Sequence, residues 1–195
     1  MPLSSPAPRK PFHIRGINCQ GYQREDGLWE VEGHLKDTRG FDVNTPWRGL
    51  IPQGEPVHDM WMRITFSEDR IIQAVEVVTD VAPYPDSCPH GVASYQNLVG
   101  LNIGAGFAKR ARERVGARTS CTHQTELLRV LGSVAIQTLG VNYTHVNKSL
   151  GNATAMYGDR GARPAILESC HSYATDNPIV NELWPAFYTG PKQEA

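Results

Sequence analysis

The sequence predicts an α+β fold, an antiparallel four-stranded meander covered on one face by helices. Two observations predict it. Segments in which apolar and polar residues alternate lie in the first half of the chain, and segments with helical periodicity lie in the second half. Strands grouped ahead of helices are typical of antiparallel α+β domains, whereas a doubly wound parallel sheet alternates the two kinds of element.

Four strands are expected in the first half. The first covers residues 12–22 and the second covers 28–36, and a turn at 25–27 joins them. Alternation places Trp29, Val31 and Leu35 on one face of the second strand and charged side chains on the other, which indicates a half-buried strand. A loop with three prolines leads to a third strand over 57–66. A fourth strand over 71–78 is rich in β-branched residues.

The second half is expected to be helical. A proline-rich loop at 82–90 leaves the sheet, because proline lacks an amide donor and restricts its neighbours. A helix or helix pair follows over 92–115. A longer helix follows over 121–139, with Thr119 or Ser120 as its N-cap and Gly140 at its end. Residues 141–163 give mixed signals, weakly helical or loop. The inward-facing candidates are Leu98, Leu101, Phe107, Ala111, Leu127, Leu128, Leu131, Val134, Ala135 and Ile136.

Length and composition limit the class of protein. The 195 residues are enough for one compact domain with a core, and 40% of them are hydrophobic. The formal net charge of −1 gives no general attraction for nucleic acid or an anionic membrane surface. No stretch approaches the roughly 18–20 uninterrupted apolar residues of a membrane span. A homodimer is an alternative to a monomer, because exposed strands on a near-neutral domain can pair with a second copy. The sequence contains no signature of a dimer interface.

Residues 1–11 are rich in proline and serine and lack the apolar stretch of a secretory signal, so they are expected to be a disordered leader. The remainder, 12–195, is expected to be a single domain whose C-terminal tail wraps over it. The predicted location is therefore the cytoplasm. There the four cysteines should be thiols or metal ligands rather than disulfides.

Three of the four cysteines have a histidine within two residues: Cys88 with His90, Cys121 with His123, and Cys170 with His171. Thiolate and imidazole are ligands that Zn²⁺ and iron–sulfur clusters prefer. The spacing is not that of a zinc finger, however. The alternative interpretation is a small buried cysteine beside a polar loop histidine.

The second pair also lies in the first turn of the predicted long helix, where free amides and the helix dipole lower the pKa of a thiol and favour an anionic group. Glu126, one turn past His123, either orients that imidazole or simply complements the dipole. His58 lies on the strand face that is expected to meet the helices. It is either a satisfied core histidine or a base with a shifted pKa. Tyr84, in the proline-rich loop, is either a phenol over a pocket or a structural plug.

Several short segments, spread over about residues 15–173, together form a recognisable pattern. They are Gly21-Tyr22, Arg24–Trp29, Glu32–Leu35 with Asp37, Val57–Met60, Pro83-Tyr84 with Cys88, Leu98–Gly100, Cys121–His123 with Glu126–Leu128, and Pro164-Ala165 with Ser169–His171. In this order they resemble the segments of the bacterial DUF2889 family. One departure concerns the site, because Ser120 and Gln124 stand where the family usually has glycine and leucine in Gly-Cys-Thr-His-Leu.

The resemblance implies a place in aromatic catabolism, including lignin degradation. It implies a cofactor-independent carbon–carbon lyase that removes carbon dioxide or formaldehyde from a lignin-derived dimer such as a phenylcoumaran and leaves a stilbene. On this hypothesis His58 and His123 divide the base and acid roles, and Tyr84 or an arginine stabilises the oxyanion. Around the small aromatic substrate we expect Trp29, Trp61, Cys121 and Trp184. His58 and the Cys121–His123 turn should face a common hollow beside the sheet.

Two alternatives belong to other classes of protein. The first is a metal- or iron–sulfur-binding scaffold of NifU-like kind, with Zn or an Fe–S cluster held by Cys88, Cys121, His123 and Cys170. Cys-x-His is not the ligand order of such scaffolds. The second is a non-catalytic protein that binds an aromatic ligand in the same cavity.

Overall fold

A computed structural model describes residues 3–149, 163–164 and 166–191, and for residues 140–149 it describes the backbone only. Two compact units divide the chain, Met1–Thr138 and Leu139–Ala195. The single domain that the sequence predicts over 12–195 stays a prediction. Residues 3–12 precede the first strand and form no helix or strand.

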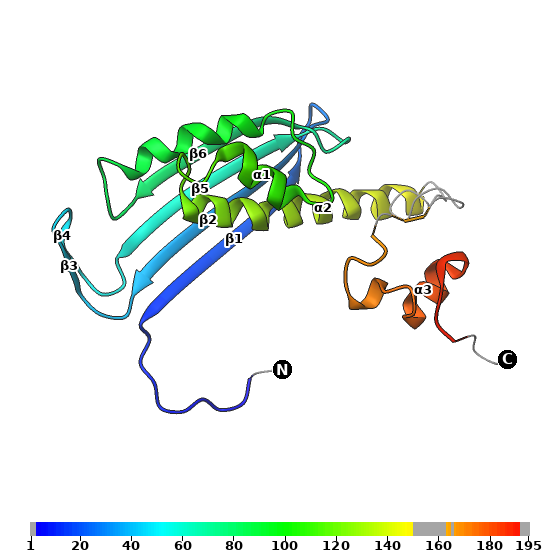
Figure 1. Cartoon of the computed structure of the whole chain (residues 1–195), viewed down its shortest axis with the longest axis horizontal. Helices are drawn as coiled ribbons and strands as arrows, with labels where there is room; N and C mark the ends of the chain where they lie inside the picture. Colours follow the sequence, from blue (N-terminus) through cyan, green and yellow to red (C-terminus); the bar gives the residue numbers. More distant parts are fainter. Residues whose placement is uncertain (1–2, 150–162, 165, 192–195) are drawn as a thin grey trace. The chain divides into compact units, whose positions relative to one another are not determined.

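The first unit contains a four-stranded antiparallel sheet in the order β1-β2-β5-β6, with strands His13–Gln23, Trp29–Arg39, Pro56–Phe66 and Ile72–Val81. This confirms the predicted α+β meander (Figure 1). Alternation also holds as predicted. In β2 the residues from Trp29 to Asp37 at every second position are buried, and in β5 Met60, Met62 and Ile64 are buried while Trp61 is 44% exposed.

A second, two-stranded sheet lies in the loop that leads from β2 to β5. It pairs β3, Val43–Thr45, with β4, Gly49–Ile51. The sequence predicted only a loop here, because strands of three residues are too short to show alternation. The hairpin holds Trp47 in its turn, and Ile51 is buried.

The strand ladders are interrupted near His58. Between β2 and β5 the pairing passes from Asp37–His58 to Thr38–Pro56, so Val57 is an extra residue. Between β5 and β6 it passes from Asp59–Val81 to Met60–Thr79, which makes Asp80 an extra residue. Bulges of this kind bend a strand and redirect its side chains, and they are common beside functional sites.

Helices cover one face of this sheet, as Figure 1 shows. They are the 3-10 helix η1, Cys88–Leu98, and the α-helices α1, Phe107–Val115, and α2, Thr122–Ser149. α2 crosses the sheet obliquely. The side-chain amide of Gln124 donates to the Val78 carbonyl on β6 at 2.9 Å, while Leu127 and Leu131 lie against Gly33 on β2. The apolar core between the helices and the sheet includes Leu35, Met60, Met62, Ile64, Phe66, Leu98, Phe107, Ala111, Leu127, Leu128, Leu131 and Ala135.

Several helix boundaries differ from the prediction. η1 begins at Cys88, inside the loop predicted for 82–90, because Pro89 is tolerated in a first turn. Thr119 and Ser120 do not cap α2, because their hydroxyls bond back to the end of α1. The Thr119 hydroxyl donates to the Val115 carbonyl at 2.6 Å, and the Ser120 hydroxyl donates to the Gly116 carbonyl at 2.6 Å. α2 also continues past Gly140 to Ser149.

Within the predicted apolar stripe of α2, Val134 is half-buried and Ile136 is 40% exposed. The other predicted stripe residues are buried. Residues 150–162, most of the segment predicted as weakly helical or loop, lie outside the described residues.

In the second unit, the described residues include η2, His171–Tyr173, α3, Pro178–Leu183, and η3, Pro185–Phe187. Leu167, Val180 and Trp184 form a small apolar core there. α3 is capped by Asn177, whose side chain accepts from the Ile179 amide at 3.0 Å. The wrapping of this tail over the rest of the chain stays a prediction. Among the described residues, no helix combines the length and apolarity that crossing a bilayer requires.

Candidate functional site

The candidate site begins with Asp37, a carboxylate on the buried face of β2. Its side chain is 1% exposed. The guanidinium of Arg15, on the neighbouring strand β1, donates to both carboxylate oxygens, at 2.7 Å each. Burial by itself would raise the pKa of Asp37, but the hydrogen bonds and charge of Arg15, together with His58, outweigh it and hold the pKa below its usual value. Asp37 is therefore a carboxylate at neutral pH.

His58 lies opposite Asp37 in the β2–β5 ladder, and its side chain is 11% exposed. Its Nδ1 is 2.9 Å from Asp37 Oδ2. Because the carboxylate can only accept, Nδ1 carries the proton and donates, which leaves the lone pair on Nε2. Burial, followed by the neighbouring His123, lowers the pKa of His58 to about 4. His58 is thus a neutral, oriented imidazole at pH 7.

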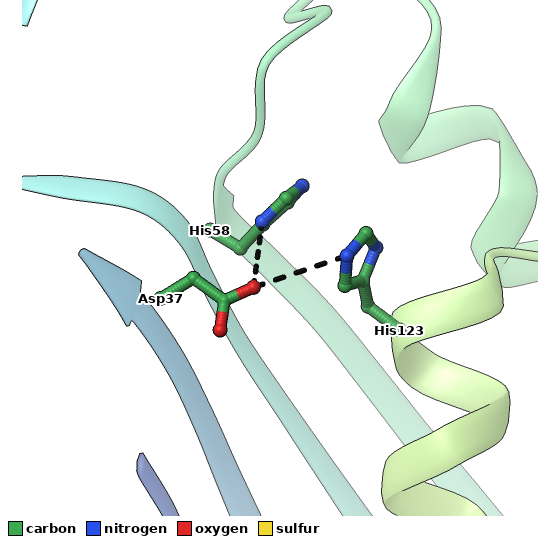
Figure 2. A group of neighbouring side chains, drawn as sticks. All are labelled: Asp37, His58 and His123. Atoms are coloured by element: carbon green, nitrogen blue, oxygen red, sulfur yellow. Dashed lines mark hydrogen bonds and ion pairs between the residues drawn. The ribbon is translucent and has the colours of Figure 1, made fainter. Parts of the chain in front are cut away.

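His123 reaches the same place from the first turn of α2. The centroids of the two imidazoles are 3.8 Å apart, and the ring planes are tilted by 32°. The Nε2 of His123 is 3.8 Å from Asp37 Oδ2 (Figure 2). Burial and then the positive charge of Arg15 lower the pKa of His123, so this ring is also neutral at pH 7. The site therefore offers both an imidazole lone pair and an imidazole N–H.

The start of α2 is held by Tyr95 from η1, which is fully buried. Its hydroxyl donates to the Cys121 carbonyl at 2.7 Å and lies 2.7 Å from Thr125 Oγ1. Burial raises the pKa of Tyr95 to about 12, so the phenol keeps its proton. Gly91 approaches the Cys121 amide closely, and a Cβ there would be 3.3 Å from that nitrogen. These contacts fix the turn that carries His123.

Further charged groups surround the three central residues. His13 Nε2 is 3.5 Å from Asp37 Oδ1, and Arg15 also forms an ion pair with Glu126 on α2. Arg15 thus lies between a buried carboxylate and a half-exposed one. The side chain of His123 is 26% exposed, against 11% for His58, so His123 is the more accessible of the two imidazoles.

The structure brings some of the predicted site residues together. His58 and His123 are in contact, which places the third strand and the start of the long helix at one site as predicted. Cys121 is close by, with Sγ 3.9 Å from His123 Nδ1. Glu126 differs from the expectation, since it forms an ion pair with Arg15, although its charge still acts on the His123 imidazole.

The other predicted residues have contacts of their own. Tyr84 is 45% exposed and packs edge-on against Trp47, with ring centroids 4.7 Å apart. Trp29 pairs with Phe66, at the opposite end of the β2–β5 ladder from Asp37 and His58. Trp61 faces the opposite side of the sheet and stacks on His34 at 3.8 Å. Trp184 belongs to the second unit, where it contacts Tyr173. Of the predicted tryptophans in the first unit, therefore, neither Trp29 nor Trp61 lines the histidine site.

The predicted metal ligands are divided between the two units, with Cys88, Cys121 and His123 in the first and Cys170 in the second. Within the described residues, one group of three ligand atoms is compact enough for a metal ion, formed by Asp37, His58 and His123, whose ligand atoms lie within 4.8 Å of one another. Cys88 and Cys121 are not part of it. Cys170 is an exposed thiol of the second unit, and all four cysteines are free. Of the four predicted ligands, this group includes His123 alone.

Asp37 and Arg15 were missed as site residues by the sequence analysis. A signal for Asp37 was present, because the alternation that buries Trp29, Val31 and Leu35 continues to position 37 and places a carboxylate in the core. A carboxylate at a buried position requires a partner. Arg15 occupies the equivalent face of β1, where Ile17 and Cys19 are also half-buried.

Residues 13–137 match a known family whose description is "Protein of unknown function (DUF2889)". The chain belongs to the DUF2889 family. The DUF2889 match includes Arg15, Asp37, His58 and His123, so the whole candidate site lies within it. No curated protein matches the chain. No solved structure matches it either.

Proposed function

We propose that this DUF2889 protein is a cofactor-independent carbon–carbon lyase acting on a lignin-derived aromatic dimer such as a phenylcoumaran. The observation that carries the proposal is the contact of two neutral imidazoles beside a buried carboxylate, with ring centroids 3.8 Å apart. An elimination that removes one proton and delivers another needs two such groups within reach of one substrate. The resemblance of the sequence to its family supplies the class of substrate.

The proposed reaction is redox-neutral. For a hydroxymethyl side chain, His58 Nε2 takes the hydroxyl proton and formaldehyde leaves as the carbon–carbon bond breaks. The released electron pair forms the new double bond, and the ring carbon–oxygen bond breaks to give a phenoxide. The proton taken up by His58 passes through His123 to that phenoxide, so the pair returns to its starting state. A carboxylate side chain would lose carbon dioxide by the same electron flow and would need only the proton delivery.

Asp37 and Arg15 act as positioning residues in this scheme. The bond from His58 Nδ1 to Asp37 holds the imidazole with its lone pair on Nε2, and the carboxylate stabilises the imidazolium formed during turnover. Arg15 keeps Asp37 ionised through its two-pronged contact. Because Arg15 is committed to Asp37 and Glu126, it is not the group that receives the phenoxide.

The test is turnover of a synthetic phenylcoumaran dimer, followed by stilbene absorbance and by release of formaldehyde or carbon dioxide. His58→Gln and His123→Gln should each lower kcat by about 100-fold or more, the usual size of a lost acid–base group. His34→Gln is the matched control. His34 also binds an aspartate, Asp59, at 2.6 Å, but on the opposite face of the sheet, and this variant should keep kcat. Full turnover by both site variants would rule the assignment out.

A metal centre at Asp37, His58 and His123 is the second candidate, favoured by the clustering of the three ligand atoms. Two imidazoles and one carboxylate are a known ligand set for divalent metals. Against it, both oxygens of Asp37 already accept from Arg15, and a cation there would have to share the carboxylate with a guanidinium. Metal analysis of protein purified without chelator separates the two candidates. One equivalent of zinc or iron that is lost in His58→Gln would favour the metal centre.

The other interpretations have distinct outcomes in the same experiments. A dimer that binds and is not converted would indicate a non-catalytic aromatic-ligand-binding protein. An iron–sulfur scaffold would need cysteine ligands, which the described group does not contain. A cytoplasmic location is part of the proposal, and the four free cysteines agree with a reducing compartment.

A further inference from the structure

A hollow lies between α1 and α2, on the exposed side of α2. Its volume is about 510 Å³, which falls within the range of small-molecule sites. From α2 it is lined by residues at helical spacing, Thr122, Thr125, Glu126 and Arg129. α1 supplies Lys109 and Arg112 from its exposed side. The hollow is therefore formed by two helices of the first unit.

The charge of this hollow is positive. Lys109, Arg112 and Arg129 line it, and in the part of the chain that the structure describes the side chain of none of the three forms a hydrogen bond or ion pair. Glu126 is the one acidic side chain among the lining residues, and it is already paired with Arg15. Three cations without protein partners around one concave site leave the hollow with an excess of positive charge.

The start of α2 adds to this attraction. Thr122 is the first residue of a 28-residue helix and lines the hollow. The first backbone bond along this helix runs from the Thr125 amide to the Cys121 carbonyl at 3.0 Å, so the amides of the residues before Thr125 donate to no carbonyl within the helix. Free amides and the helix dipole favour a negative group at such an end. The three cations and the helix end act on the same space.

We propose that this hollow binds a small molecule through a carboxylate or phosphate group. Arg112 on α1 and Arg129 on α2 both line the hollow, and each carries a guanidinium, the group that binds such anions through two parallel hydrogen bonds. The site is separate from the histidine pair, and Glu126 links the two because it lines the hollow and also binds Arg15. The proposal concerns binding alone and does not depend on the lyase reaction.

The experiment is calorimetric titration of the full chain with inorganic phosphate and, separately, with benzoate, at low ionic strength where screening is weak. At least one of the two anions should bind. Arg112→Gln and Arg129→Gln should each weaken that binding by about tenfold, the usual effect of losing a charged hydrogen bond. The matched control is Lys36→Gln, which removes a cation from the opposite face of the sheet and should leave the affinity unchanged.

The two probes separate the possible ligands. Binding of phosphate alone assigns the hollow to phosphate esters, and binding of benzoate alone assigns it to aromatic carboxylates. Glu126→Gln should tighten binding severalfold, because it removes the one carboxylate of the lining, and a variant that merely damaged the structure would not do so. Failure of both anions to bind, or equal affinity in the wild type, Arg112→Gln and Arg129→Gln, would overturn the proposal. Circular dichroism of each variant checks that it is folded.

Discussion

Two aspartate–histidine pairs on the same sheet differ in their surroundings. On the open face His34 Nε2 lies 2.6 Å from Asp59, and on the covered face His58 Nδ1 lies 2.9 Å from Asp37. Asp37 is 1% exposed and Asp59 is 18% exposed. Burial is what lowers the pKa of His58, and Arg15 is what keeps its partner ionised. The same two residue types therefore make a surface contact in one place and a candidate catalytic pair in the other.

The stability of the protein should depend on pH through His58. The pKa of this group is about 4 in the folded chain and 6.5 as its ordinary value. Between these values the unfolded chain binds a proton and the folded chain does not, so falling pH favours unfolding. The free energy of unfolding should fall by up to about 3 kcal/mol between pH 6.5 and pH 4 and show no further loss from this group below that.

Urea denaturation across this pH range measures the effect. The His58→Gln variant has no titrating side chain at position 58, so its free energy of unfolding should change less with pH than that of the wild type. Equal pH dependence of the two proteins would show that His58 does not titrate differently on folding. The lowered pKa of Asp37 changes stability in the same direction, because the stabilisation from its ionised carboxylate is lost as pH falls below 3.8.

Arg15 should matter more for stability than other arginines of the sheet. Arg15→Gln would leave the buried carboxylate of Asp37 without its cation, and we expect a loss of about 2 kcal/mol, reduced from the fully buried case because Arg15 is partly exposed. Arg63→Gln is the control. Arg63 pairs with Glu32 and Glu76 on the open face, where such pairs contribute less than about 1 kcal/mol. Similar losses in thermal or urea unfolding of both variants would contradict this.

At the scale of elements, the site depends on how closely α2 approaches the sheet. Gly33 on β2 makes that approach possible, since a Cβ there would lie 2.7 Å from Leu127 and 3.0 Å from Leu131. Gly132 has the same role on the helix, where a Cβ would lie 2.5 Å from the Phe107 ring of α1. The absence of a side chain at these two positions therefore lets α2 pack closely against both β2 and α1. The close packing brings His123 down to the level of Asp37.

Gly33→Ala should destabilise the protein by about 1–3 kcal/mol, because the added methyl group overfills a buried interface. The matched control is Gly16→Ala on β1, where an added Cβ meets nothing within 4 Å. That change should be neutral or slightly stabilising, since alanine restricts the unfolded chain. Unfolding midpoints in urea measure both variants. An equal effect of the two substitutions would mean that the helix does not pack closely at Gly33.

At the scale of the whole molecule, the family and the structure divide the chain at nearly the same place. The DUF2889 match ends at residue 137, and the first compact unit ends at Thr138. The candidate site and the proposed anion hollow both lie before this boundary. The first unit therefore contains all the groups on which the two proposals depend.

A fragment of residues 1–138 should fold as an independent domain. The sheet, η1, α1 and the part of α2 from Thr122 to Thr138 are within the first unit, together with the apolar core between them. We expect cooperative thermal unfolding and the same pH dependence of stability as in the full chain. Gradual, non-cooperative melting of the fragment, beside cooperative melting of the full chain, would show that residues after 138 are needed for folding.

Much of the fold could be predicted because its signals are local. Alternation in β2 and β5 identified the buried faces, placed His58 on the covered side and placed Trp61 on the other. The assignment of Trp61 to the substrate pocket ignored that same alternation. The end of α2 was misplaced because a glycine inside a helix costs only about 1 kcal/mol, which packing can offset. The short β3–β4 pair had too few residues to show a period.

The sequence by itself determined the sheet, its two faces, the presence of the long helix and the family to which the chain belongs. Only the tertiary structure decided which polar side chains meet. Asp37 and His58 are 21 residues apart, and Arg15 and Glu126 are 111 residues apart. Periodicity describes which way a side chain points within its own element, but a contact between elements depends on strand register, on bulges and on how closely a helix can approach. The candidate site is made of contacts of that second kind.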